Sequence, residues 1–191
     1  MTATTTTGTL RERIVAAAVD TTLADGWSQV TMARLAGVVG VSRQTVYNEV
    51  GGKPALAEAM ILAELDRFLS IVTDAFDTHP TDLVAAIEQA TAGVLRLARG
   101  NDLLKAVVSA THGADTELLP LLTTHAESLL ESAKLVVAER VRTYDVPLDE
   151  HLDPAIDMVV RVVLSHVMQP SGPPEETAAD LAWIASRVLR G

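Results

Sequence analysis

The stretch TMARLAGVVGVSRQTVYNEVGGK, residues 31–53, decides the fold of the chain, because it joins two short helical patterns through a tight turn. Thr31 is a predicted N-cap, and the apolar residues behind it recur at spacings of three and four: Met32, Leu35, Ala36 and Val39. Gly40 can adopt the left-handed conformation that ends a helix, and Ser42 is a second N-cap. A second helix then runs to about Val50. The stretch is therefore a helix-turn-helix candidate.

The second helix separates apolar from polar residues. Val46 and Val50 lie four residues apart on one face, and the polar residues around them are expected to point outward. Arg and Gln near a helix N-terminus can pair with guanine and adenine edges, whereas Thr, Tyr and Lys suit phosphates. We therefore assign DNA contact to Thr31, Ser42, Arg43, Gln44, Thr45, Tyr47, Asn48 and Lys53. The alternative is a helical hairpin with an ordinary solvated face.

The flanks of this stretch carry further motifs in a fixed order, from a helix before it to a helix start after it. They are Ile14, Ala17 and Ala18; Gly26 followed by Trp27; Leu35-Ala36; Gly40-Val41-Ser42; Val46-Tyr47; and Lys53 before Leu56. On these residues the segment resembles the DNA-binding domain of the TetR family of one-component bacterial regulators. The sequence departs from the family pattern at Thr22 and Val50, where phenylalanine is usual, and at Gly37, which lies in mid-helix.

Composition restricts the fold and the chemistry. A chain of 191 residues fits one large or two small domains, and with 48% hydrophobic but only 3% aromatic residues its core must be aliphatic. The absence of cysteine excludes disulfides, thiol catalysis and cysteine-bound metal. The threonine-rich N-terminus is not a secretory signal, and the most apolar stretch, residues 155–168, is too short to span a bilayer. We expect a soluble, cytoplasmic protein.

The net charge of −10 is unevenly distributed along the chain. Residues 1–53 hold five Lys or Arg and four Asp or Glu, whereas the remainder holds ten basic and twenty-one acidic residues. An acidic body repels DNA everywhere except at the face that is presented to it, which limits non-specific binding.

The fold is predicted to be all-α, because no stretch alternates with period two. A helix over residues 9–25 supports the two short ones, and a long helix from Lys53-Pro54 to about Thr78 links the DNA-binding head to the body. That long helix is either a lever or a packing helix without a signalling role. Further helices are expected over residues 81–99, 102–110, 117–144, 154–168 (capped by Asp153) and 174–190. We divide the chain into a tail and helix-turn-helix domain, residues 1–53, and a ligand-binding and dimerisation domain, residues 54–191.

The last two helices are apolar on more than one side, so each must be buried on more than one side. One side can pack within its own domain and the other against a second copy, although a fully internal helix is an alternative. The resemblance implies the same, since the family dimerises through its last two helices. The predicted interface residues are Val160, Val163, Leu164, Val167, Leu181, Ile184 and Val188.

A ligand pocket is predicted in the body from aliphatic residues with a few polar points. The candidates are Phe68, Leu69, Leu104, Val107, Leu121, Leu122, His125, Leu129, Val159, Val163 and His166, each of which could equally be ordinary core. They include hardly any carboxylate, so the expected effector is small, largely apolar, and neutral or weakly anionic. The histidines lack the spacing of metal ligands, and we predict no metal and no cofactor.

No catalytic motif is present, so no residue is assigned a catalytic role. The sequence predicts a ligand-responsive transcriptional regulator, a repressor, that binds a palindromic operator in double-stranded DNA as a homodimer. The alternative function is a soluble helical carrier or sensor of apolar ligands that no longer binds DNA. A helical enzyme is the remotest reading.

Overall fold

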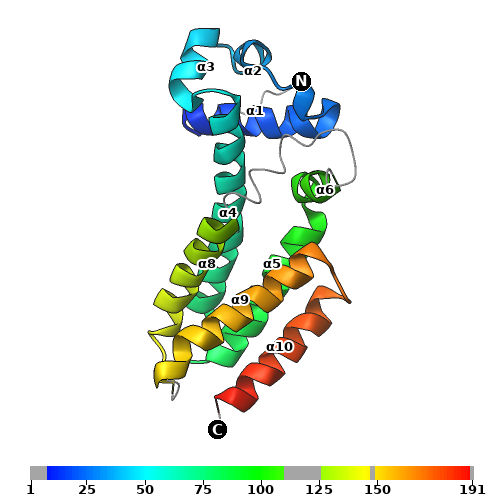
Figure 1. Ribbon diagram of the computed structural model, residues 1–191. Helices are drawn as coiled ribbons and strands as arrows, with labels where there is room; N and C mark the ends of the chain where they lie inside the picture. Colours follow the sequence, from blue (N-terminus) through cyan, green and yellow to red (C-terminus); the bar gives the residue numbers. More distant parts are fainter. Residues whose placement is uncertain (1–7, 110–125, 147–148, 190–191) are drawn as a thin grey trace. The chain divides into compact units, whose positions relative to one another are not determined.

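All regular secondary structure in the described part of the chain is helical, which confirms the all-α prediction. The computed structural model describes residues 8–109, 126–146 and 149–189. Its α-helices, drawn in Figure 1, are α1 (Leu10–Asp25), α2 (Met32–Val39), α3 (Arg43–Val50), α4 (Lys53–Thr78), α5 (Leu83–Gly100), α6 (Asp102–Ser109), α8 (Ala126–Val141), α9 (Leu152–Met168) and α10 (Pro174–Val188). Short 3₁₀ helices cover Trp27–Gln29 and Asp149–His151. No helix among these residues is both long and apolar enough to cross a membrane.

The helices form two compact units. Among the described residues, unit 1 holds those up to Leu65 together with α6, and unit 2 holds those from Asp66 to Asn101 together with α8, α9 and α10. The helix α4 runs from one unit into the other. The predicted boundary between residues 53 and 54 divides the chain by function and stays a prediction.

Unit 1 is organised around an aliphatic core. Its largest fully buried side chains are Ile14, Val30, Leu35, Val46 and Leu56, and Trp27 is 3% exposed. Burying one such aliphatic side chain stabilises the fold by about 1.5–3 kcal/mol. The first helix begins with a capping box, in which Glu12 N donates to Thr9 Oγ1 at 3.2 Å and Thr9 N donates to Glu12 Oε2 at 2.8 Å.

Unit 2 is built from closely packed helices with small side chains. The helix α10 lies along α5, and both bury alanines. A core of larger residues lies between the end of α4, α5, α8 and α9; it includes Phe76, Leu83, Val141, Ile156 and Val160. Small residues let helix backbones approach closely, so unit 2 buries its surface with few aromatic side chains.

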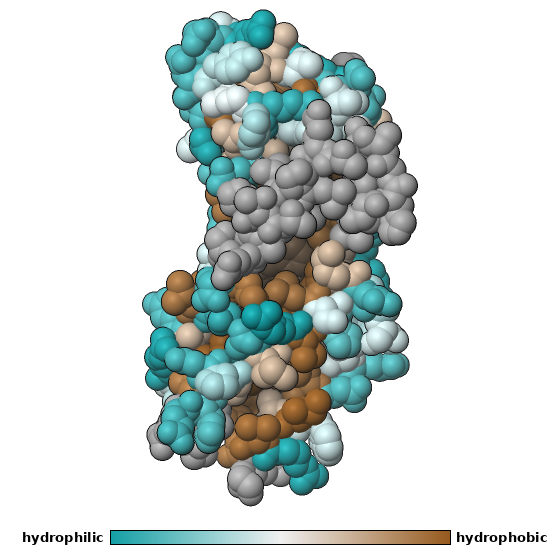
Figure 2. All heavy atoms as spheres, viewed as in Figure 1, coloured by the Kyte–Doolittle hydropathy of each residue, from teal (hydrophilic) through white to brown (hydrophobic). Residues whose placement is uncertain are grey.

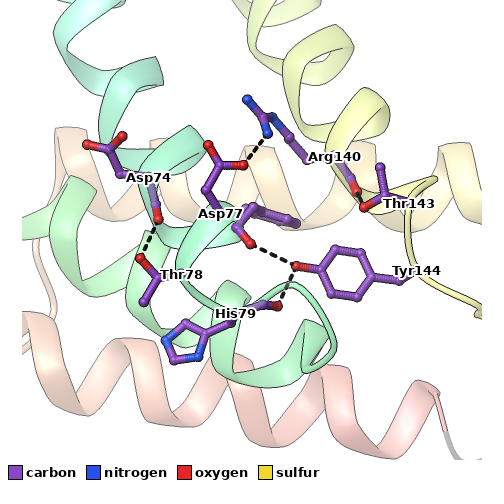
Figure 3. A network of polar contacts seen from close by, with 8 residues as sticks. Asp74, Asp77, Thr78, His79, Arg140, Thr143 and Tyr144 are labelled. Carbon is purple, nitrogen blue, oxygen red and sulfur yellow. Dashed lines mark hydrogen bonds and ion pairs between the residues drawn. The ribbon is translucent and has the colours of Figure 1, made fainter.

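A polar network holds the C-terminal end of α4 within unit 2 (Figure 3). The Tyr144 hydroxyl lies 2.7 Å from the carbonyl oxygen of His79 and 3.2 Å from that of Phe76, and it donates to them. Its ring meets the Phe76 ring edge-on, with centroids 5.9 Å apart, and Arg140 pairs with Asp77. Burial raises the pKa of Tyr144, and the nearby carboxylates Asp77 and Asp82 add to the effect. The hydroxyl therefore keeps the proton that these bonds need.

The observed helix boundaries correct one predicted cap and cover only part of one predicted helix. The helix α9 begins at Leu152 after His151, so Asp153 lies in the first turn instead of capping it, and its carboxylate pairs with Arg142 at 3.2 Å. The helix expected over residues 117–144 is present from Ala126 to Val141, and residues 117–125 lie outside the described part of the chain.

One glycine fixes the distance between α4 and α5. A Cβ atom added at Gly93 would lie 2.5 Å from Cγ2 of Ile71, whereas nothing lies within 4 Å of one added at Gly37. Gly93 therefore permits a helix contact that any larger residue would obstruct, and Gly37 has no such role.

Alanine substitutions at Gly93 and Gly37 should have opposite effects on stability. We expect Gly93→Ala to lower the free energy of unfolding by about 1–3 kcal/mol, because the added methyl overpacks the contact. Gly37→Ala should raise it by up to about 1 kcal/mol through helix propensity alone. Urea unfolding followed by circular dichroism measures both. An Ile71→Ala variant, which lacks the side chain that the added methyl would meet, serves as the control background. If Gly93→Ala raises the free energy of unfolding of the wild-type protein as much as that of the Ile71→Ala variant, the proposed contact is wrong.

Candidate nucleic-acid interface

The turn between α2 and α3 has the geometry that the sequence predicts. Thr31 caps α2 by accepting from Arg34 N at 3.2 Å, and Ser42 caps α3 by accepting from Thr45 N at 3.0 Å. Gly40 ends α2 in the left-handed conformation, with φ +76° and ψ +37°. Each cap uses a lone pair of its hydroxyl oxygen, so the hydroxyl proton of Thr31 remains able to donate to a phosphate.

The helix α3 is attached by one face and exposes the other. Val46 and Val50 are 0% and 3% exposed in the core of unit 1, as predicted. Arg43, Gln44, Tyr47 and Asn48 are exposed, and Thr45 is half-buried. The structure thus brings the predicted DNA-contacting residues of α3 together on one helix, although their contact with DNA stays a prediction.

The exposed residues of α3 also pair with one another at helical spacing. Gln44 Nε2 donates to Asn48 Oδ1 at 3.0 Å, and the Arg43 guanidinium lies 5.5 Å from the centroid of the Tyr47 ring. Such pairs four residues apart stabilise a helix by about 0.2–0.5 kcal/mol and order its long side chains. An amide held in this way presents a defined edge, which suits paired hydrogen bonds to a base.

Lys53 is placed by an aromatic contact. Its Nζ lies 4.8 Å from the centroid of the Trp27 ring, which is itself buried. A cation over an aromatic face is attracted by the ring quadrupole, and this holds the ammonium group at the start of α4. The role of Lys53 as a phosphate contact stays a prediction.

Two arginines of α1 that the sequence analysis did not assign also contact this motif. Arg11 Nη1 donates to the carbonyl oxygen of Glu49 at 2.6 Å, and Arg13 Nη2 donates to that of Val39 at 2.8 Å. These carbonyls belong to the last turns of α3 and α2. The only sequence signal was the presence of two basic residues beside the apolar face of α1, which does not reveal a tertiary partner.

The predicted ligand residues fall in both units, so the pocket stays a prediction. Phe68, Leu69, Leu129, Val159, Val163 and His166 are half-buried in unit 2, and Leu104 is half-buried in unit 1. Val107, Leu121, Leu122 and His125 lie outside the residues whose side chains the structure describes. A ring nitrogen of His166, Nδ1, lies 2.8 Å from the carbonyl oxygen of Val162, so its own helix satisfies that nitrogen. The described residues contain no cluster of three His, Asp or Glu that could hold a metal.

The predicted dimer residues divide by exposure. Leu164, Ile184 and Val188 are 40%, 51% and 51% exposed, and they accompany Met158, Val162 and Trp183 as large exposed apolar residues of α9 and α10. Figure 2 shows apolar surface over this part of unit 2. Val163 and Val167 are half-buried. Val160 and Leu181 are 7% and 5% exposed in the core of unit 2 and so offer little surface to a partner, and their assignment to the interface stays a prediction.

Comparisons with known proteins agree on one family. A family model described as the C-terminal domain of the bacterial tetracyclin repressor matches residues 82–187. The HTH-type transcriptional regulator AlkX of Mycobacterium tuberculosis is 28% identical over 174 residues, which cover 91% of this chain and 82% of that protein.

Two solved structures are similar to almost the whole of this chain. The TetR family repressor AlkX from a Dietzia strain, implicated in biodegradation of n-alkanes, is 26% identical, with a TM-score of 0.73 and coverage of 95% of this chain and 96% of the other. A transcriptional regulator from a Rhodococcus strain, 19% identical, has a TM-score of 0.61 over 96% of this chain and 97% of its own, which supports the fold alone.

Proposed function

Because this chain belongs to the TetR family of transcriptional regulators, which bind DNA and are not enzymes, we propose that it is a ligand-responsive repressor that binds a palindromic operator as a homodimer. The observation that carries the proposal is α3, whose polar face is exposed while Val46 and Val50 are buried in the core of unit 1. The similarity to a protein described as a repressor supports the direction of regulation. A repressor acts on chromosomal DNA, so we place it in the cytoplasm.

We place α3 in the major groove. Gln44 and Arg43, in its first turn, carry the donors and acceptors that pair with adenine and guanine edges. Tyr47, Lys53 and Thr31 are assigned to phosphates, which fix the register of the helix without reading sequence. Only a small positive charge resides in residues 1–53, so neutral donors must supply much of the phosphate contact.

Replacing Gln44 should weaken binding to the operator selectively. Gln44→Ala is expected to cost about 1–3 kcal/mol in operator affinity and to relax base preference at one position, because a bidentate base contact is lost. The matched control is Gln29→Ala, an exposed glutamine of unit 1 outside the helix-turn-helix. Sequence selection from random DNA followed by gel-shift titration gives both values.

Equal affinities of the Gln44 and Gln29 variants would contradict the assignment of α3. Failure of the wild-type protein to select any sequence would favour the alternative, a carrier or sensor of apolar ligands.

The exposed apolar surface of α9 and α10 supports the homodimer. Large apolar side chains of both helices are exposed there, and exposed apolar surface of this kind marks an association site. A second copy presents the same surface, so a two-fold axis makes it self-complementary. A dimer also supplies two recognition helices for two half-sites about 34–36 Å apart or a multiple of that distance.

An aspartate at Ile184 should prevent dimerisation without unfolding unit 2. The side chain is 51% exposed in one chain, so its replacement leaves the core intact, whereas a carboxylate buried at the interface costs several kcal/mol. Sedimentation at micromolar concentration should show monomers of Ile184→Asp and dimers of Leu135→Asp, a control at an exposed leucine of α8. Monomeric wild-type protein would contradict the proposal.

We propose an aliphatic effector for unit 2. The described candidates there, apart from His166, are apolar, and none is a carboxylate that could compensate a cation. The similarity to a repressor implicated in biodegradation of n-alkanes points to an aliphatic compound and to genes that process such compounds.

In this proposal, the effect of ligand binding reaches the DNA-binding unit through α4. Phe68 and Leu69 lie on the same helix that begins with Lys53 in unit 1, so a ligand against them acts on a segment shared with the DNA-binding unit. To release DNA, the ligand must bind more tightly to the conformation that does not fit the operator.

A thermal-shift screen across charge classes tests this chemistry. Saturated fatty acids and neutral long-chain compounds should raise the melting temperature and lower operator affinity together, because burial in an apolar site contributes about 25 cal/mol per Å². Organic cations of equal size serve as the control class. Stabilisation by cations alone would overturn the proposed pocket but would leave the DNA-binding assignment intact.

A further inference from the structure

We infer that Arg11 and Arg13 are positioning residues for sequence recognition: from α1 they hold the C-terminal ends of α3 and α2 and thereby set how the recognition helix is presented to a base pair. The inference rests on the proposed binding of operator DNA. It concerns contacts within unit 1 alone.

The acceptors of both arginines are carbonyls that a helix cannot satisfy by itself. The last four carbonyls of an α-helix lack intrahelical donors, and Glu49 and Val39 lie within the last turns of α3 and α2. The backbone donors directly after each helix bond to other carbonyls: Gly51 N donates to Tyr47 O, and both Gly40 N and Val41 N donate to Ala36 O. The guanidinium groups donate to the carbonyl oxygens of Glu49 and Val39 at 2.6 Å and 2.8 Å.

Charge strengthens these two contacts. The C-terminal end of a helix carries partial negative charge, so a cation there is favourable, and a hydrogen bond from a charged donor is stronger than a neutral one. Arg11 and Arg13 are two positions apart on α1, which places them on different sides of its apolar face. One helix thus fixes the ends of two others and leaves less freedom for α3 to tilt.

This use of the arginines differs from phosphate contact. Residues 1–53 hold five basic side chains, of which Arg34 pairs with Asp25 and Arg11 and Arg13 bond to helix ends. If α3 tilts, base contacts lose their geometry, whereas contacts to the uniform phosphate backbone adapt to the shift. Loss of either arginine contact should therefore reduce discrimination between sequences more than it reduces binding to DNA in general.

The test measures affinity for the selected operator and for a scrambled duplex over a range of salt concentrations. We expect R11M and R13M each to lower the ratio of operator to scrambled affinity about tenfold while the salt slope stays unchanged. R11K should recover part of the ratio, because an ammonium can also donate to the Glu49 carbonyl. The charge control is R34M, which removes a cation of unit 1 whose side chain pairs with Asp25, and its ratio should stay at the wild-type value.

Two results would overturn the inference. A salt slope smaller by about 0.9 in R11M, with operator and scrambled affinity falling in parallel, identifies Arg11 as a phosphate contact. A lowered melting temperature with an unchanged ratio in both R11M and R11K identifies a purely structural role. Wild-type protein that does not discriminate at all contradicts the proposed function instead, so the two failures are distinguishable.

Discussion

Two buried valines, Val46 and Val50, attach α3 to unit 1, and what the chain presents to DNA depends on that attachment. The helix has eight residues, whereas an isolated helix shorter than about 12–15 residues is marginal in water. Packing, the Ser42 cap and the arginine at its far end must therefore maintain it. The polar face is free to serve recognition because a few contacts on the opposite face supply the stability.

Features set by neighbouring residues were predictable from the sequence, and features set by distant residues were not. Thr31, Gly40 and Ser42 act through their own turns, so their cap and turn roles followed from residue type and spacing. The partners of Arg11 and Arg13 lie 38 and 26 residues away. Periodicity likewise showed that α9 and α10 are apolar on several sides, but only packing reveals that Val160 and Leu181 face inward while Ile184 and Val188 face outward.

The same packing gives unit 2 both its stability and its surplus apolar surface. Alanines on α5 and α10, with Gly93 against Ile71, allow close helix contacts that bury much of each helix. The larger side chains of α9 and α10 that do not fit into this core remain outside, and a single chain leaves them exposed. Tight internal packing and the capacity to associate are thus two consequences of one distribution of side-chain sizes.

Hydroxyl-radical footprinting of the wild-type protein on its selected operator tests the central claim most directly. A homodimer with one recognition helix per subunit predicts two equivalent protected regions, related by the two-fold symmetry of the site and spaced by about 10 base pairs or a multiple. A single protected region, or protection that is uniform along any DNA, would contradict the claim that paired α3 helices read a palindrome.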